Sequence, residues 1–300
     1  MIRKPRKPSL ELLTLRALAP RFPQQYPTYK YFEKDLGRAE SGYKGEQSID
    51  YYLNVAARSN HNLIYHHLRL LTPESAFQID TLTLTPKFIL IIEIKYLGGV
   101  MLEFNHETNQ LKQTFQDHSV EMHDCPLLQV KRQANHLKDW LNKKGYDQIP
   151  VEHLVVMTHR SPELKFSNGF PECNRIIRSS FLDFSISEIE RKYSHTVLKS
   201  HELSNLDFTL LSSHKEKSPN VLQKYNLHLD QVKKGLLCPK CLTLPMLREK
   251  KSWYCKRCSR RTNEREELLK ALQEFSLLVS PTIKNSEFRD FFGVYPMPDM

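Results

Sequence analysis

The sequence lacks any apolar run long enough to cross a membrane. Its longest apolar stretch, Phe88 to Ile92, has the length of a β-strand, whereas a membrane-spanning helix needs about 20 apolar residues. The N-terminus is basic, but it lacks the apolar segment that completes a secretory signal. We therefore expect a cytoplasmic protein with no membrane partner.

Cysteine is also scarce, and its distribution argues against a disulfide framework. The chain has six cysteines, and four of them form two Cys-x-x-Cys pairs near the C-terminus. Paired cysteines in a chain without a secretory signal indicate zinc rather than disulfides. The other two, Cys125 and Cys173, are expected to be buried thiols in a reducing compartment.

Acidic residues are fewer than basic ones, and this charge imbalance indicates what kind of molecule the protein binds. The chain has 34 Asp and Glu against 44 Lys and Arg, a formal net charge of +10. Such an excess favours a polyanion such as nucleic acid, but it says nothing about the fold. With 300 residues, 40% of them hydrophobic, the chain can hold one substantial domain and a smaller module.

Two predicted strands in the first half of the chain place charged residues in apolar rows. The first, Gln78 to Thr85, alternates and puts Asp80 on the face of its leucines. The second, Phe88 to Tyr96, extends an isoleucine row with Glu93 and Lys95. Because buried charges need partners or a metal, a carboxylate beside Glu-x-Lys indicates a divalent-cation site with an adjacent lysine.

Two predicted helices add polar residues beside these strands. Ser41 to Arg58 carries Glu46 on the same stripe as its apolar residues, which suits either an active-site acid or a first-turn glutamate that stabilises the helix N-terminus. Pro126 to Lys144 carries Gln129 beside its apolar stripe. On that helix, Lys131, Arg132 and Gln133 are interpreted as a solvated edge that could face DNA.

These motifs together resemble those of the nuclease-related (NERD) domain, a branch of the PD-(D/E)xK nuclease superfamily. The resemblance covers roughly Ser41 to Gly145, and two family positions differ, at Lys87 and Cys125. Its motifs occur in the family's order: Gly45-Glu46 opening a helix, Gln78-Ile79-Asp80, Glu93-Ile94-Lys95 before a glycine pair, and Cys125-Pro126-Leu127-Leu128-Gln129.

The resemblance implies a Mg²⁺- or Mn²⁺-dependent phosphodiesterase site. Asp80, Glu93 and the backbone carbonyl of Ile94 would hold the cation. Lys95 would orient or deprotonate the attacking water, Glu46 would act in the outer shell, and Gln129 would hold substrate or water. These roles come from the family pattern.

The two Cys-x-x-Cys pairs predict a second metal site. Thirteen residues separate the pairs, which is enough for a hairpin, and four thiolates form a closed tetrahedral zinc site of structural type. The ligands would be Cys238, Cys241, Cys255 and Cys258. The module resembles the zinc ribbons of topoisomerase tails.

Basic residues in and near the predicted ribbon suit phosphate binding. Its aromatic residues, Trp253 and Tyr254, could stack on exposed bases, but packing of the small ribbon core explains them better. With the helical edge above, the predicted nucleic-acid-binding residues are Lys131, Arg132, Lys250, Lys251, Lys256 and Arg257.

The expected fold is α/β, with a mixed β-sheet core flanked by helices as in restriction endonucleases, a C-terminal zinc ribbon and a helical tail. The predicted divisions are an N-terminal arm (1–40), the nuclease-like domain (41–211), a linker (212–234), the ribbon (235–262) and a helical segment (263–300).

Three functions remain open on these residues. The first is a metal-dependent nuclease with DNA as its expected substrate and with the ribbon aiding binding. The second is an inactive nucleic-acid-binding or protein-interaction module on the same fold. The third is an unrelated α/β protein with a ribbon, in which the sheet does not bring Asp80 and Glu93 together.

Overall fold

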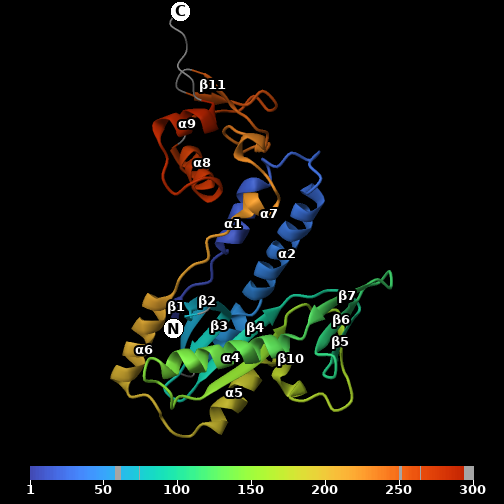
Figure 1. Cartoon of the computed structure of the whole chain (residues 1–300), viewed down its shortest axis with the longest axis vertical. Coiled ribbons are helices and arrows are strands. Elements are labelled where there is room, and N and C mark those ends of the chain that lie inside the picture. The colour runs from blue at the N-terminus through green and yellow to red at the C-terminus, as the bar shows by residue number, and fades with distance from the viewer. Residues whose placement is uncertain (58–61, 74, 250–251, 264, 294–300) are drawn as a thin grey trace, which may run out of the picture. The chain divides into compact units, whose positions relative to one another are not determined.

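The computed structural model describes residues 1–57, 62–73, 75–249, 252–263 and 265–293 (Figure 1). These residues form two compact units. Unit 1 combines Met1–Lys7 with Ser41–Glu216, and unit 2 combines Pro8–Glu40 with Lys217–Met300. The segment predicted as one N-terminal arm is thus divided between the units.

A mixed β-sheet forms the centre of unit 1, in the strand order β1-β2-β3-β4-β8-β10. Strands β2, β3 and β4 are antiparallel neighbours, while β8 and β10 follow β4 in parallel. The strands span Ile2–Lys4 (β1), Leu63–Leu71 (β2), Ala76–Leu84 (β3), Ile89–Lys95 (β4), Val151–Met157 (β8) and Ile176–Arg178 (β10). The two strands predicted in the first half of the chain are therefore present as β3 and β4.

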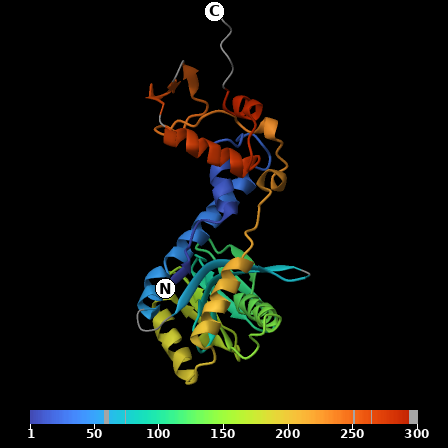
Figure 2. The same cartoon turned by 90° about the vertical axis from the view of Figure 1, so that its left-hand side faces the viewer.

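Helices cover both faces of this sheet because β4 is apolar on both sides. Leu82 and Ile91 pack in the cluster that contains the buried face of α4 (Pro126–Asn142). Leu90 and Ile92 pack instead with α3 (Asp50–Ala57) and α5 (Leu182–Lys192). Figure 2 shows α4 (green) and α5 (yellow) on opposite sides of the sheet. The predicted mixed α/β class is confirmed.

A second, smaller sheet follows β4, in the order β7-β6-β5-β9. A further helix, α6, follows α5 in the chain. These elements span Met101–Asn105 (β5), Gln110–Thr114 (β6), Val120–Asp124 (β7), Glu163–Phe166 (β9) and Ser200–Ser213 (α6).

The single helix predicted over Ser41–Arg58 is wrong. The chain forms α2 (Tyr29–Gln47) and then α3, with a break at Ser48 and Ile49. At the break, the hydroxyl of Ser48 donates to the carbonyl of Gly45 at 2.6 Å. A serine bond of this kind competes with the helical backbone pattern and favours a helix end. Arg58 lies outside the described residues.

Unit 2 builds one core from both ends of the chain. Leu15 and Phe32 share a cluster with Trp253 of the ribbon and with Phe275 and Phe291 of the tail. Arg21, fully buried, donates to Glu274 at 2.7 Å. The helices are α1 (Leu10–Leu18), α7 (Val221–Lys224), α8 (Arg265–Leu278) and α9 (Asn285–Phe292), and the ribbon strands are β11 (Leu247–Glu249), β12 (Ser252–Tyr254) and β13 (Arg261–Thr262). Among the described residues, no helix has the length and apolar character that crossing a bilayer requires.

Candidate active site and metal centre

The pairing of β3 with β4 brings the two predicted acidic ligands to the same point of the sheet. Thr81 pairs with Ile92 and Leu82 with Ile91. Continuing that register by one residue places Asp80 opposite Glu93, and residues directly opposite on antiparallel strands share a face. In addition, the backbone N–H of Ile94 donates to Oδ2 of Asp80 at 2.9 Å.

Asp80 lies in an environment that opposes its negative charge. Burial raises the pKa of its carboxyl well above the ordinary value, and the neighbouring charges of Glu93 and Glu46 raise it further. The Ile94 N–H and the Lys95 ammonium act in the opposite direction but do not cancel these effects. A cation bound among these acids would relieve the repulsion.

Glu93 is almost fully buried and is held by two side chains. Its Oε1 lies 2.8 Å from Nζ of Lys95, and its Oε2 accepts from the amide of Gln133 at 2.8 Å. The prediction that Gln133 belongs to a solvated edge is wrong, because its side chain is buried against Glu93. The other amide atom, Oε1 of Gln133, is buried and has no hydrogen-bond partner among the described residues.

Lys95 connects the sheet to α4. Besides Glu93, its ammonium donates to Oε1 of Gln129 at 2.9 Å. Gln129 is exposed and lies one helical turn before Gln133, so the two glutamines present their amides along one side of α4. The helix therefore places one amide on the carboxylate and one on the lysine.

Glu46 reaches the site from the C-terminal end of α2. The expectation that Gly45-Glu46 opens a helix, with Glu46 in a first turn, is wrong. The preceding Gly45 explains the placement, because a Cβ there would lie 2.5 Å from Cβ of Tyr96 and 2.9 Å from Oγ1 of Thr158. Only glycine lets the helix end come so close to the end of β4, where Lys95 lies, and to Thr158, which directly follows β8.

Two residues at this site were not predicted from the sequence. Arg6, whose side chain is only 4% exposed, donates to Oε2 of Glu46 at 3.1 Å and to Oδ1 of Asp50 at 2.9 Å. The ring of His67 also contacts Oε2 of Glu46. His67 has a φ of 52° in the middle of β2, a conformation that is uncommon for a non-glycine residue and tends to occur at functional sites.

The donor set fits a hard divalent cation. Mg²⁺ and Mn²⁺ take carboxylate and carbonyl oxygens and keep several waters, and the site offers Asp80 and Glu93 with an unpartnered amide oxygen of Gln133 beside them. The acids are not gathered tightly, however. In the part of the chain that the structure describes, one group of three or more His, Cys, Asp or Glu side chains has all its ligand atoms within 4.8 Å of one another, and that group is the four cysteines.

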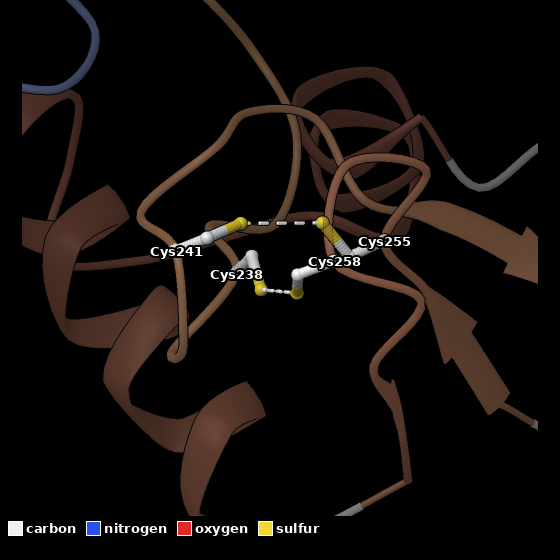
Figure 3. Close-up of side chains that lie close together, drawn as sticks. All are labelled: Cys238, Cys241, Cys255 and Cys258. Carbon is white, nitrogen blue, oxygen red and sulfur yellow. Dashed lines mark hydrogen bonds between the residues drawn. The ribbon is translucent and has the colours of Figure 1, made fainter.

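The four cysteines of the ribbon have the geometry of a zinc site (Figure 3). The Sγ atoms of Cys238 and Cys258 are 3.6 Å apart, and those of Cys241 and Cys255 are 3.5 Å apart. Tetrahedral zinc with Zn–S bonds of about 2.3 Å requires sulfur separations of about 3.8 Å. Hydrogen bonding with Thr243 lowers the pKa of Cys241 to about 6, which favours the thiolate that binds metal.

The predicted nucleic-acid-binding residues lie in different environments. Lys131 pairs with Glu172 at 2.7 Å, whereas Arg132 is exposed. Lys256 and Arg257 are exposed on the ribbon, and Lys250 and Lys251 lie outside the described residues.

The remaining ribbon and cysteine predictions gave mixed outcomes. Trp253 is buried in the ribbon core, as the packing interpretation predicts, with Arg248 over its ring. Cys125 is buried, but the prediction that Cys173 is buried is wrong, because it follows an exposed turn at Glu172 and is itself exposed.

Comparison with known proteins identifies the part of the chain that carries the acidic site. Residues 41–158 match the family described as the nuclease-related domain (NERD). No curated protein and no solved structure matches the chain. The matched residues include Glu46, Asp80, Glu93, Lys95 and Gln129. Arg6 precedes the matched range, and the four cysteines of the ribbon follow it. The chain therefore carries a nuclease-related (NERD) domain at residues 41–158, together with a C-terminal four-cysteine cluster consistent with a zinc ribbon.

Proposed function

We propose that this protein is a divalent-metal-dependent nuclease that hydrolyses phosphodiester bonds in nucleic acid, with DNA as the substrate. The observation that carries the proposal is the convergence of Asp80 and Glu93 from adjacent strands, with Lys95 on Glu93. Two carboxylates that face each other in a half-buried site repel, so a bound cation gives them a stabilising partner.

Asp80, Glu93 and the Ile94 carbonyl would hold Mg²⁺ or Mn²⁺. When bound, the ion would supply Lewis-acid stabilisation of the phosphate charge and lower the pKa of a bound water. The buried Oε1 of Gln133 offers a hydrogen-bond acceptor to such a water, because none of the residues that the structure describes donates to it. The residues present thus match the requirement for a sparse oxygen-ligand set.

Lys95 has the position to act on the attacking water and on the phosphate. Its ammonium is held between Glu93 and Gln129, so the amine is oriented before substrate arrives. A fixed donor at that point stabilises negative charge that develops on the phosphate oxygens. Gln129, exposed on α4, would help to hold the water or the substrate.

The ribbon would contribute affinity rather than chemistry. Four thiolates leave no open coordination position for a water or substrate on zinc. Lys256 and Arg257 are exposed and would neutralise phosphates without reading sequence. Arg132, on α4 of the nuclease-related domain, would do the same closer to the acidic site.

Cleavage assays on the zinc-loaded full chain test this proposal. Circular and linear DNA, and RNA of the same sequence, are incubated with Mg²⁺, with Mn²⁺ or with a chelator. We expect metal-dependent cleavage by wild type and its loss in Asp80→Ala, Glu93→Ala and Lys95→Ala. Cut circles would identify an endonuclease.

A second ion pair in unit 1 provides matched controls. Glu103 and Lys112 lie 2.9 Å apart on β5 and β6, outside the acidic site, so Glu103→Ala and Lys112→Ala should cleave like wild type. Normal cleavage by any of the three site variants would refute the assignment. Binding without cleavage under all metal conditions would instead favour the inactive module.

A further inference from the structure

We propose that Arg6, which precedes the matched domain, is a positioning residue of the acidic site: it fixes the carboxylate of Glu46 and links α2 to the strand that carries Asp80. The inference rests on the function proposed above. Its starting point is the side chain of Arg6, which is 4% exposed although it belongs to the first few residues of the chain.

The N-terminal strand brings Arg6 to this position. β1 pairs in parallel with β2 at the edge of the sheet, and Nζ of Lys4 donates to the carbonyl of His66 at 2.9 Å. Arg6 follows two residues later, and His67, the residue of β2 with the positive φ, follows His66 directly. Anchoring of β1 therefore decides where the guanidinium lies.

The guanidinium connects three elements at once. It donates to Glu46 at the end of α2 and to Asp50 at the start of α3. It also donates to Oγ1 of Thr81 in β3 at 3.3 Å, and Thr81 is the residue next to Asp80. Arginine is suited to such bridging because its planar fork carries several fixed N–H donors.

The hydroxyl of Thr81 extends this connection to β2. It lies 3.0 Å from Nδ1 of His66. Burial lowers the pKa of His66 to about 3, and the charge of Arg6 contributes to the shift. The ring is therefore neutral at physiological pH, so Nδ1 can accept from Thr81 while Thr81 accepts from Arg6.

Both contacts to Glu46 use the same oxygen. Arg6 and His67 each meet Oε2, which fixes the rotation of the carboxylate about its last bond. Arg6 thus connects Glu46, which it contacts directly, with the β3 segment of Asp80, which it contacts through the neighbouring Thr81. A fixed Oε2 leaves Oε1 as the oxygen with which Glu46 can serve a water or cation beside Asp80.

Arg3, in β1 and three residues before Arg6, offers a comparison. Its guanidinium makes a bidentate contact to Asp207 in α6, with Nε 2.9 Å from each carboxylate oxygen. It thus anchors β1 by an arginine–carboxylate pair of the same kind, but its partner is not among the acids of the candidate site. Lysine at either position keeps the positive charge but lacks the planar guanidinium group with its several N–H donors.

The test measures Mn²⁺ binding to the zinc-loaded full chain by calorimetry, without nucleic acid. Because outer-shell partners typically contribute 10- to 100-fold to metal affinity, Arg6→Lys should weaken Mn²⁺ binding by about tenfold. Arg3→Lys should stay within about twofold of wild type. In a Glu46→Gln background, Arg6→Lys should add little, because the residue acts through Glu46.

Two outcomes separate this inference from the function on which it rests. If Asp80→Asn weakens Mn²⁺ binding and cleavage while Arg6→Lys behaves like Arg3→Lys, the role of Arg6 is refuted and the nuclease proposal stands. If Asp80→Asn leaves Mn²⁺ binding unchanged, both are refuted. If Arg6→Lys also lowers stability, two comparisons distinguish a loss of folding from a loss of positioning. These are Arg3→Lys, and Glu46→Gln with and without Arg6→Lys.

Discussion

Substitution of Gly45 by alanine tests how the end of α2 positions Glu46. The added Cβ would lie 2.5 Å from Cβ of Tyr96 and 2.9 Å from Oγ1 of Thr158. The Tyr96 atom is next to its backbone and cannot swing away, so the helix end or β4 must move. Tyr96 follows Lys95, and Gly45 precedes Glu46, so that movement reaches two residues of the candidate site.

Gly42 provides the matched control on the same helix. A Cβ at Gly42 meets nothing within 4 Å, so alanine there should stabilise by up to about 1 kcal/mol through helix propensity. Overpacking typically costs about 1–3 kcal/mol. The free energy of unfolding of Gly45→Ala should therefore lie about 1–3 kcal/mol below that of Gly42→Ala, the difference being the steric cost alone.

Tryptophan fluorescence allows this difference to be measured in unit 1. The chain has two tryptophans, buried Trp140 in α4 of unit 1 and buried Trp253 in the ribbon of unit 2. In a Trp253→Phe background, urea unfolding followed by fluorescence reports on Trp140. Cleavage by Gly45→Ala should fall by on the order of 10- to 100-fold, because small displacements of catalytic groups are costly. Equal stability of the two variants with unchanged cleavage would refute the reasoning.

Three further predictions concern the acids, the zinc site and the basic residues. Asp80→Asn should stabilise metal-free unit 1 by up to about 1 kcal/mol near neutral pH, because the raised pKa of Asp80 means that its stabilising proton is lost as the pH rises. In urea unfolding the gain should vanish below about pH 3, where the carboxyl is protonated in both the folded and the unfolded state, and its persistence there would contradict the assignment. Cys241→Ser should lower the zinc content from one ion per chain, measured by metal analysis, and shift the fluorescence emission of Trp253 to the red. Cys125→Ser should keep the zinc content and the emission wavelength of wild type. Arg132→Ala should weaken nucleic-acid binding and reduce the slope of log K against log salt concentration by about 1. Lys131→Ala should change that slope less, because Lys131 already pairs with Glu172. Equal slopes for the two variants would argue against a phosphate contact at Arg132.

The strand pattern and the cysteine spacing were sufficient to predict much of this arrangement. A period of two along β3 predicts that Asp80 shares a face with the leucines of its strand, and the same period along β4 predicts that Glu93 and Lys95 share a face with isoleucines, because side-chain direction in a strand is a local property. That Asp80 and Glu93 lie opposite each other depends in addition on the register of the two strands. Two Cys-x-x-Cys pairs likewise predict one metal site, since each pair is a local turn. Neither inference requires knowledge of distant contacts.

The errors concern features that depend on packing rather than on local pattern. Gln133 and Arg132 are adjacent polar residues in one helix, yet only Gln133 turns toward the buried Glu93. Arg6 meets Thr81 and Glu46 only because β1 pairs with the edge of the sheet. The helix break at Ser48 was also missed, although the serine and the preceding glycine were signals that could have indicated it.

Crystals of the zinc-loaded protein soaked in Mn²⁺ would test the central claim most directly, by anomalous scattering from manganese. We predict a single peak in unit 1 at coordination distance from the carboxylates of Asp80 and Glu93 and the carbonyl of Ile94. Absence of a peak there at saturating Mn²⁺, with Glu93 still paired to Lys95 and Gln133, would contradict the account.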